Sequence, residues 1–259
     1  MLNQNNMQNL YLSIIIPSYN EETNIRLGSL EKVARYLEHQ KYSWEVLIID
    51  DGSTDASVSL IHEFVKENKG FQLIQNPHQG KAATVVTGLM KANASIILFT
   101  DLDQATPLKE LEHVLPWFEE GSDVVIGSRQ GRREGAPLLR KIMAKGFMFL
   151  RTVILGLQGI SDTQCGFKAF TRDAARNIVR HLYIYSQSRT VSGAMVTAGF
   201  DIEMLFVAKT LGYTIKEVPV EWHYVETRRV NPIKDTIQGI SDILSIRMYA
   251  WKGRYDKSK

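Results

Sequence analysis

Cysteine is almost absent from this chain, since Cys165 is the single one in 259 residues. One thiol cannot form an intramolecular disulfide, so a disulfide-stapled scaffold is excluded and a reducing compartment is expected. Long apolar runs are also missing, because no stretch reaches the ~18 uninterrupted apolar residues that a transmembrane helix needs. The polar residues 1–11 lack the charged and apolar parts of a signal peptide. We therefore expect neither a transmembrane helix nor a signal peptide.

Sequence motifs for common nucleotide cofactors are missing too. No Gly-x-Gly-x-x-Gly follows a predicted strand, which argues against a nicotinamide cofactor. The segment from Gln79 to Ala82 resembles the end of a P-loop, but the first glycine is missing and Ala82 replaces the Ser or Thr that holds magnesium. The six histidines show no spacing typical of paired metal ligands. The sequence thus supports neither a dehydrogenase nor a P-loop NTPase.

Net charge is small, at +3, but it is unevenly distributed. Residues 129–151 carry seven Lys or Arg and one Glu, and residues 228–259 carry eight Lys or Arg and three Asp. Two basic segments on an otherwise acidic chain predict an anionic partner, which could be a membrane, a nucleic acid or a phosphorylated substrate. We expect no nucleic acid, because neither segment is a basic motif rich in aromatic residues.

Apolar runs alternate with helical patterns in the first two thirds of the chain. Five runs predict strands, namely Leu12–Pro17, Trp44–Ile49, Phe71–Ile74, Ser95–Thr100 and Asp123–Gly127. Residues 21–39, 80–92 and 107–120 between them predict helices. Strands separated by helices predict an α/β domain with a doubly wound, mostly parallel sheet. Ligands of such sheets bind at the carboxyl ends of the strands, where this chain has polar residues: Asp50, Asp51, Asp101, Asp103, Ser128 and Arg129.

Two later segments predict long amphipathic helices. Residues 137–157 combine a broad apolar face with basic side chains at helical spacing: Arg140, Lys141, Lys145 and Arg151. In the second helix, which starts at Asn231 and Pro232, apolar residues recur every three or four positions up to Trp251. Basic amphipathic helices with aromatic residues suit a membrane surface. The alternative is that they cover the sheet and that their charges are solvated, and the pattern leaves both interpretations open.

Several motifs together resemble those of family 2 glycosyltransferases with the GT-A fold, a Rossmann-like fold that binds nucleotide sugars. The matching segments are Ile14–Glu22, Ile49–Asp55, Asp101–Asp103, Gly127–Arg129, Asp162–Lys168, Phe200–Glu203 and Glu217–Trp222. The later segments narrow the match to polyprenyl-phosphate enzymes, and they are most similar to dolichyl-phosphate β-glucosyltransferases, relatives of the dolichyl-phosphate mannose synthases. The similarity covers about residues 13–250.

This resemblance implies a site for a nucleotide-sugar donor in residues 12–128. The residues implied to line it are Pro17, Tyr19, Glu21, Asp50, Asp51, Gly80, Lys81, Asp101, Leu102 and Asp103. Among these, Asp51 would bond the base and Asp101 would face the sugar or ribose. Asp103 would hold Mg²⁺ or Mn²⁺ on the diphosphate.

The same resemblance implies an acceptor site in residues 129–228. Arg129, helped by Arg140, would meet an acceptor phosphate, and Gln164 and Lys168 would line the acceptor side. Asp201 occupies the region where many relatives place a catalytic carboxylate, so the implied catalytic residues are Asp101, Asp103, Arg129 and Asp201. The expected organisation is a polar tail at 1–11, a catalytic domain at 12–228 and a basic amphipathic helix with a tail at 229–259.

The implied reaction is an inverting sugar transfer to a polyprenyl phosphate, which gives a β-linked product. A phosphate monoester has a second pKa near 6 and needs no general base, but it needs cations to approach a diphosphate. A lipid acceptor also requires docking, so we expect peripheral binding to the cytoplasmic face of an anionic membrane. UDP-glucose is favoured as the donor by resemblance alone, while the lipid and the oligomeric state stay open.

Two alternatives remain. An enzyme of the same fold with a soluble glycan acceptor would need a carboxylate base, for which Asp201 and Glu203 are the candidates. A nucleotide-sugar-binding protein without enzymatic activity would need the donor pocket but not Arg129. One departure bears on the sugar, because Ala105 stands where mannose synthases usually have a Gln that binds the metal.

Overall fold

The computed structural model describes residues 10–129, 138–185, 198–223 and 232–256, without the side chains of 138–145, 198 and 232–236. The strands of this part of the chain are β1 (Leu12–Ser18), β2 (Trp44–Asp50), β3 (Phe71–Gln75), β4 (Ile96–Thr100), β5 (Val124–Ser128), β6 (Phe167–Thr171) and β7 (Ile215–Pro219). They form one sheet in the order β3-β2-β1-β4-β6-β5-β7. Strand β6 is antiparallel to both neighbours and the other pairs are parallel, so the predicted α/β fold is confirmed.

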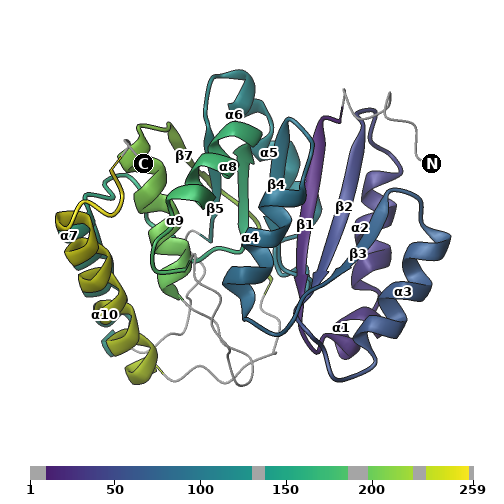
Figure 1. Ribbon diagram of the computed structural model, residues 1–259, viewed down its shortest axis with the longest axis horizontal. Coiled ribbons are helices and arrows are strands. Elements are labelled where there is room, and N and C mark those ends of the chain that lie inside the picture. The colour runs from purple at the N-terminus through teal and green to yellow at the C-terminus, as the bar shows by residue number, and fades with distance from the viewer. Residues whose placement is uncertain (1–9, 130–137, 186–197, 224–231, 257–259) are drawn as a thin grey trace.

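Helices cover both faces of this sheet (Figure 1). One face packs against α1 (Glu22–Arg26), α2 (Ser29–Leu37), α3 (Ser57–Glu67), η2 (Leu108–Glu110), α5 (Leu111–Val114) and α6 (Pro116–Glu119). The other packs against α4 (Lys81–Lys91), α8 (Arg172–His181) and α9 (Ala198–Leu211). Helices α7 (Leu138–Leu155) and α10 (Pro232–Trp251) pack on each other beyond α9, and α10 packs on α9. Strands β1, β2, β4 and β5 are buried on both sides between these two layers, which explains why they read as continuous apolar runs.

The helix predicted at residues 21–39 is broken in two. Gly28 has a φ of 79°, a left-handed conformation that side chains with a Cβ rarely adopt, and it separates α1 from α2. The helix predicted at 107–120 is likewise divided into η2, α5 and α6, and Pro116 begins the last of these. Proline has no N–H and is restricted to the first turn of a helix, so it starts a new helix here.

Helices α7 and α10 lie side by side at one end of the molecule (Figure 1). They approach closely because Gly239 has no side chain, since a Cβ at this position would lie 2.7 Å from the Phe147 ring. Both segments were predicted to be helical, and this is confirmed, although Asn231 lies outside the described residues. None of the helices described is long and apolar enough to cross a bilayer.

The reversed strand β6 was not predicted, and it changes what reaches the edge where the parallel strands end. Because β6 runs the other way, it begins at that edge: Phe167 pairs with Thr100 at the end of β4, and Lys168 pairs with Ile126 near the end of β5. The loop Ile160–Gly166, which leads into β6, therefore arrives beside the ends of β4 and β5.

Candidate active site

Two buried carboxylates at the end of β2 organise the surrounding loops. Asp50 accepts hydrogen bonds from two backbone N–H groups of its own turn, at 3.0 Å each. Asp51 accepts hydrogen bonds from the backbone N–H groups of Gln79 and Gly80, at 2.9 Å each. Asp51 thus ties the end of β2 to the loop that begins α4. A contact between Asp51 and a nucleotide base stays a prediction.

An aromatic pair lies next to Asp51. The ring of Tyr19, just after β1, stacks on the ring of His78 with centroids 4.2 Å apart and planes 10° from parallel. His78 Nδ1 lies 2.9 Å from Asp51 Oδ2, which orients the imidazole. A flat aromatic surface at the ends of the strands is the kind of platform on which a nucleotide base stacks. Sequence reasoning missed His78, although it lies in the same loop as the predicted Gly80.

Of the other residues predicted near the base and ribose, Pro17 is half-buried within β1. Glu21 is also half-buried, and its backbone N–H donates to Ser57 Oγ at 2.7 Å. That bond joins the segment after β1 to the start of α3, so the structure places these residues at the same strand ends as Asp51.

Asp101 joins the loops at the ends of β3 and β4. The Lys81 ammonium donates to Asp101 Oδ1 and forms an ion pair with it. On its other side Asp101 lies against Gly166, where an added Cβ would overlap the Asp101 carboxylate. Asp101 therefore lies between Lys81 of the predicted donor site and the loop that precedes β6.

This close approach makes Gly166→Ala a sharp test of where Asp101 must lie. The new methyl group would push the flexible Asp101 side chain away while the backbone keeps its path. We expect kcat/KM for the donor to fall about 10- to 100-fold, because displacements of about 1 Å in an active site have effects of that order. The matched control is Gly146→Ala, where an added Cβ meets nothing within 4 Å. Equal activity of both variants would show that the position of Asp101 is not critical.

Asp103 completes the Asp-x-Asp sequence. Its Oδ1 accepts a hydrogen bond from the backbone N–H of Ala105 at 3.0 Å, and the intervening Leu102 is buried. Among the described residues, no group of three or more His, Cys, Asp and Glu could hold a metal by itself. One or two carboxylates suit Mg²⁺ or Mn²⁺ when substrate phosphates and water supply the other ligands. The Asp101–Asp103 pair fits a metal of this kind.

Arg129, directly after β5, forms a bidentate ion pair with Asp162. Its Nε and Nη2 donate to the two carboxylate oxygens at 2.7 and 2.8 Å, and its backbone N–H also donates to Asp162 at 3.1 Å. Burial alone would raise the pKa of Asp162, but the hydrogen bonds and charge of Arg129 outweigh it and lower the pKa to about 2. Burial alone would lower the pKa of Arg129, yet Asp162 raises it above its usual range, and Asp101 adds to this effect. Both groups are therefore charged at neutral pH.

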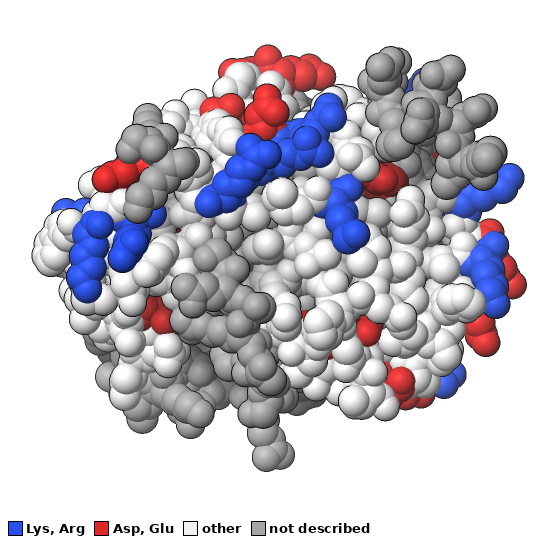
Figure 2. Space-filling model, in the orientation of Figure 1, with Lys and Arg blue, Asp and Glu red and all other residues white. Residues whose placement is uncertain are grey.

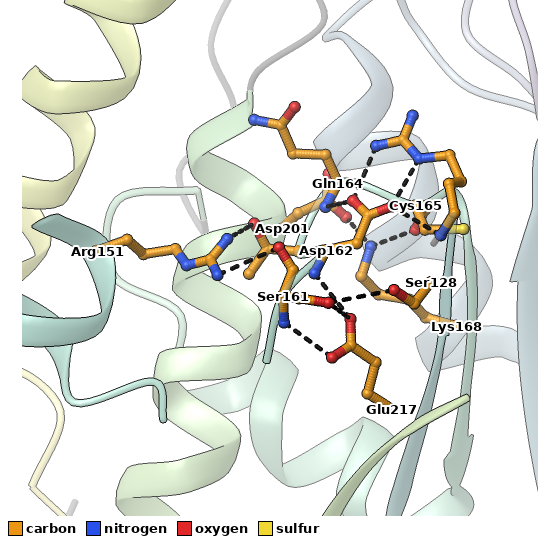
Figure 3. A network of polar contacts seen from close by, with 11 residues as sticks. Ser128, Arg151, Ser161, Asp162, Gln164, Cys165, Lys168, Asp201 and Glu217 are labelled. Atoms are coloured by element: carbon orange, nitrogen blue, oxygen red, sulfur yellow. Dashed lines mark hydrogen bonds and ion pairs between the residues drawn. The ribbon is translucent and has the colours of Figure 1, made fainter. Parts of the chain in front are cut away.

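The loop carrying Asp162 is fixed by Glu217 on β7 (Figure 3). Glu217 Oε2 accepts a hydrogen bond from the backbone N–H of Ser161 at 2.8 Å. Glu217 Oε1 accepts two more, from the Ser161 hydroxyl and from the backbone N–H of Asp162, at 2.8 Å each. Ser128 Oγ lies 3.3 Å from Ser161 Oγ, so the end of β5 is joined to the same cluster.

Arg151 holds the same loop from α7, which corrects its predicted place on an exposed basic face. Its side chain is only 3% exposed, and its guanidinium donates to Thr163 Oγ1 at 2.9 Å and to the Ile160 carbonyl at 2.5 Å. Burial lowers the pKa of Arg151, while Glu217 and Asp162 oppose the shift. The helical spacing identified a basic residue correctly but could not show that this one points inward.

Lys168 forms an ion pair with the partly buried Asp201 on the other side of the loop. The Lys168 ammonium donates to Asp201 Oδ1 and to the Cys165 carbonyl, at 2.6 Å each. Lys168 is fully buried, whereas Gln164 is exposed. The structure therefore brings Lys168 and Asp201 together beside the loop, with Gln164 at its surface.

The suggestion that Glu203 could act as a base is wrong. Glu203 is fully buried on α9 and accepts hydrogen bonds from the backbone N–H groups of residues 183–185 and from the Tyr255 hydroxyl. Burial raises the pKa of Glu203, although these hydrogen bonds oppose the shift. Its oxygens hold the segment after α8 and the end of the chain after α10, so Asp201 is the one carboxylate left from that alternative.

The structure gathers the predicted donor and acceptor residues at one edge of the sheet. Arg129 links the two groups, because the charges of both Asp162 and Asp101 raise its pKa. The Arg129 guanidinium also lies 5.8 Å from the centre of the Trp222 ring. The prediction for Arg140 falls in the part of α7 whose side chains are not described. The main residues that sequence reasoning left without a role are His78, Asp162 and Glu217.

The arrangement is that of a GT-A glycosyltransferase, and solved structures share it. Mannosyl-3-phosphoglycerate synthase from Rubrobacter xylanophilus superposes with a TM-score of 0.65 at 16% identity, over 96% of this chain and 77% of that one. Glucosyl-3-phosphoglycerate synthase from Mycobacterium tuberculosis, solved with Mn²⁺, UDP and glucosyl-3-phosphoglycerate, gives a TM-score of 0.62 at 18% identity, over 92% of this chain and 80% of that one. At these identities the likeness concerns the fold.

The sequence defines the family. Residues 13–179 match the model of Glycosyl transferase family 2, and the chain belongs to that family. The dolichyl-phosphate beta-glucosyltransferase of Dictyostelium discoideum is 33% identical over 95% of this chain and 76% of its own length. The protein of the same name from Saccharomyces cerevisiae is 29% identical over 97% of this chain and 78% of its own length. The one from Homo sapiens is also 29% identical, over 92% of this chain and 75% of its own length. The resemblance noted from the motifs is thus confirmed.

Proposed function

We propose that this protein transfers glucose from UDP-glucose to dolichyl phosphate or another polyprenyl phosphate. The observation that carries the proposal is the Arg129–Asp162 pair, which holds a guanidinium at the carboxyl edge of the sheet, close enough to Asp101 for their charges to interact. A fixed guanidinium is the group best suited to bind a phosphate. The named relatives support the choice of lipid acceptor and sugar.

In the proposed reaction, an oxygen of the acceptor phosphate attacks the anomeric carbon. The new C–O bond forms as the bond from that carbon to the diphosphate breaks, and the nucleoside diphosphate leaves with the electron pair. Arg129 reduces the repulsion between the incoming phosphate and the donor diphosphate, and Asp162 keeps its guanidinium in place. A single displacement inverts the anomeric carbon, so an α-linked donor gives a β-linked product.

The donor side depends on Asp101, Asp103 and Lys81. A divalent metal bound by Asp103, with Asp101 beside it, would neutralise charge that develops on the leaving diphosphate. Lys81 keeps Asp101 oriented through their ion pair. The Tyr19–His78 stack offers a surface for the base.

The proposed function is tested by a transfer assay. Labelled UDP-glucose, UDP-GlcNAc and GDP-mannose are offered separately with polyprenyl phosphate and Mg²⁺ or Mn²⁺, and label is extracted into organic solvent. We expect extractable label from UDP-glucose. Donor hydrolysis without lipid-linked label would point to a soluble acceptor, and Asp201→Asn would then abolish transfer because an alcohol acceptor needs a base. Failure to bind any donor would exclude the glycosyltransferase assignment of the site.

We further propose that α7 and α10 dock on an anionic membrane, where a lipid acceptor resides. Large apolar side chains are exposed on both helices, with Phe149 and Val153 on α7 and Leu244 and Trp251 on α10. On α10 the exposed Ile237, Leu244 and Trp251 are seven residues apart, which places them on one stripe of the helix. Figure 2 shows Lys and Arg side chains beside uncharged surface at the end of the molecule formed by these helices. Apolar side chains next to cations are typical of helices that bind anionic lipid surfaces.

Vesicle flotation checks this docking surface. We expect binding to vesicles that contain phosphatidylserine, with weakening in high salt. Leu244→Gln combined with Trp251→Gln should lower the bound fraction at least about 10-fold, because burial of each side chain contributes on the order of 2 kcal/mol. The matched control is Leu27→Gln, which changes a leucine that is at least as exposed as Leu244 but lies near the start of α2. Equal binding by the control and the double variant would contradict the proposed surface.

A further inference from the structure

Glu217 and Arg151 approach the loop Ile160–Gly166 from opposite sides (Figure 3). Glu217 comes from β7 and Arg151 from α7, so elements far apart in the sequence meet at one short connection. Neither side chain bonds Arg129 directly in the contacts described above. Both instead hold the backbone or a hydroxyl of the loop that presents Asp162 to Arg129.

The contacts of Glu217 differ from those of an ordinary surface carboxylate. Its two oxygens accept three hydrogen bonds, all from the consecutive residues Ser161 and Asp162. Hydrogen bonds to a carboxylate are shorter and about twice as strong as those between neutral groups. By fixing the backbone N–H of Asp162, Glu217 limits the directions in which the Asp162 side chain can point.

The position of Asp162 in turn determines the position of the Arg129 side chain. Its carboxylate receives three N–H groups of Arg129, one from the backbone and two from the guanidinium. The path of contacts thus runs from Glu217 through Ser161 and Asp162 to the guanidinium. A shift of the loop would be transmitted to Arg129, because two parallel hydrogen bonds fix the guanidinium plane relative to the carboxylate.

We propose that Glu217 is a positioning residue for the acceptor and that it acts through Asp162 on Arg129, with Arg151 bracing the loop from the other side. This rests on the proposed function, in which Arg129 meets the acceptor phosphate. Glu217 sets the place and plane of the guanidinium and touches neither substrate. Its loss therefore changes use of the acceptor and leaves use of the donor alone.

Glu217→Gln is the variant that tests this role. Glutamine keeps the size of the side chain but places an NH₂ group where one oxygen now accepts the Ser161 N–H. We expect the acceptor KM to rise and the acceptor kcat/KM to fall about 10-fold, with the KM for UDP-glucose changed less than 2-fold. Glu63→Gln, at an exposed position on α3, is the matched control. A lower Tm with unchanged acceptor KM would overturn the proposal and leave Glu217 a purely structural role.

A double-mutant cycle then shows whether Glu217 acts through Arg129. In an Arg129→Lys background the bidentate pair is already lost. We therefore expect Glu217→Gln to lower the acceptor kcat/KM of that variant by less than a further 2-fold. A further 10-fold fall in the acceptor kcat/KM of the double variant would overturn the proposal. If Glu217→Gln folds poorly, Ser161→Ala removes the hydroxyl bond to Glu217 together with the 3.3 Å contact to Ser128 Oγ, and it keeps both backbone bonds to Glu217. A smaller rise in acceptor KM is then expected, and Ser128→Ala controls for the lost contact.

The two proposals fail differently. If Arg129→Lys leaves the acceptor KM unchanged, the proposed contact with the acceptor phosphate fails, and the role of Glu217 fails with it. If Arg129→Lys raises the acceptor KM while Glu217→Gln does not, the proposed function stands and the inference about Glu217 is overturned.

Discussion

Replacement of Asp103 by alanine is expected to lower kcat for sugar transfer about 100-fold or more. A carboxylate on the metal that neutralises a leaving diphosphate acts mainly in the transition state, and groups that stabilise developing charge contribute about 2.7–4 kcal/mol. Asp103 Oδ1 also accepts a hydrogen bond from the backbone N–H of Ala105 at 3.0 Å, so the folding of this variant has to be measured as well. Organic-extractable label from UDP-glucose measures the effect.

A second measurement separates loss of the metal site from loss of folding. The wild-type protein should be stabilised against heating by Mn²⁺ together with UDP, since a ligand that binds only the native state raises Tm. We expect Asp103→Ala to lose the metal-dependent part of that increase. Asp173→Ala on α8 removes an aspartate from the opposite edge of the sheet and should behave like wild type. Full transfer by Asp103→Ala would refute the assigned role.

Arg129→Lys is expected to reduce kcat/KM for polyprenyl phosphate about 10- to 100-fold. Lysine keeps the positive charge but cannot make the two parallel hydrogen bonds to Asp162, so the cation is no longer held in one plane. A hydrogen bond to a charged group contributes about 1.5–3 kcal/mol, which corresponds to the expected range. Initial rates at varied acceptor concentration give this value, and the KM for UDP-glucose should change little.

Arg129→Ala is the less informative variant, for a physical reason. It would leave the Asp162 carboxylate without its guanidinium, and the effect of burial, which raises the pKa of Asp162, would lose its main opponent. An ion left unpaired in a largely buried place destabilises a protein by about 3–5 kcal/mol, so lost activity would be mixed with lost stability. Arg172→Lys is the control for replacing an arginine by a lysine, because Arg172 lies at the start of α8, at the edge of the sheet opposite the site. If Arg129→Lys instead weakens UDP binding, Arg129 serves the donor.

The strands with apolar side chains on both faces could be predicted from the sequence, and β6 and β7 could not. Strands such as β1 contact apolar residues above and below the sheet, so each reads as an unbroken run. Strand β6 contains Lys168, which is buried because Asp201 and a carbonyl pair with its charge. Strand β7 lies at the edge and contains Glu217, whose partners come from a distant loop. Local patterns do not show such distant partners.

The candidate site was predicted in outline for a similar reason. Residues at the ends of parallel strands must lie at one edge, so the grouping of Asp51 and Asp101 followed from the strand pattern. Pairing partners did not follow, because Asp162 and Arg129 are 33 residues apart and meet only through the reversed strand. The helical spacing of basic residues also could not separate Arg151, which points inward, from its neighbours. The strand pattern thus predicted which residues lie at one edge of the sheet, but not which of them form pairs.

The direction of β6 has a consequence for how new acceptor preferences can evolve. A parallel strand at this position would begin at the far edge, whereas β6 begins where its neighbours end. One seven-residue connection, Ile160–Gly166, thereby supplies the partner of Arg129 and the close neighbour of Asp101. In the proposed function, substitutions at residues 160–165 would alter the acceptor side, whereas a substitution at Gly166 would also displace Asp101 on the donor side. In the proposed function, one loop can thus change the acceptor preference without a new fold.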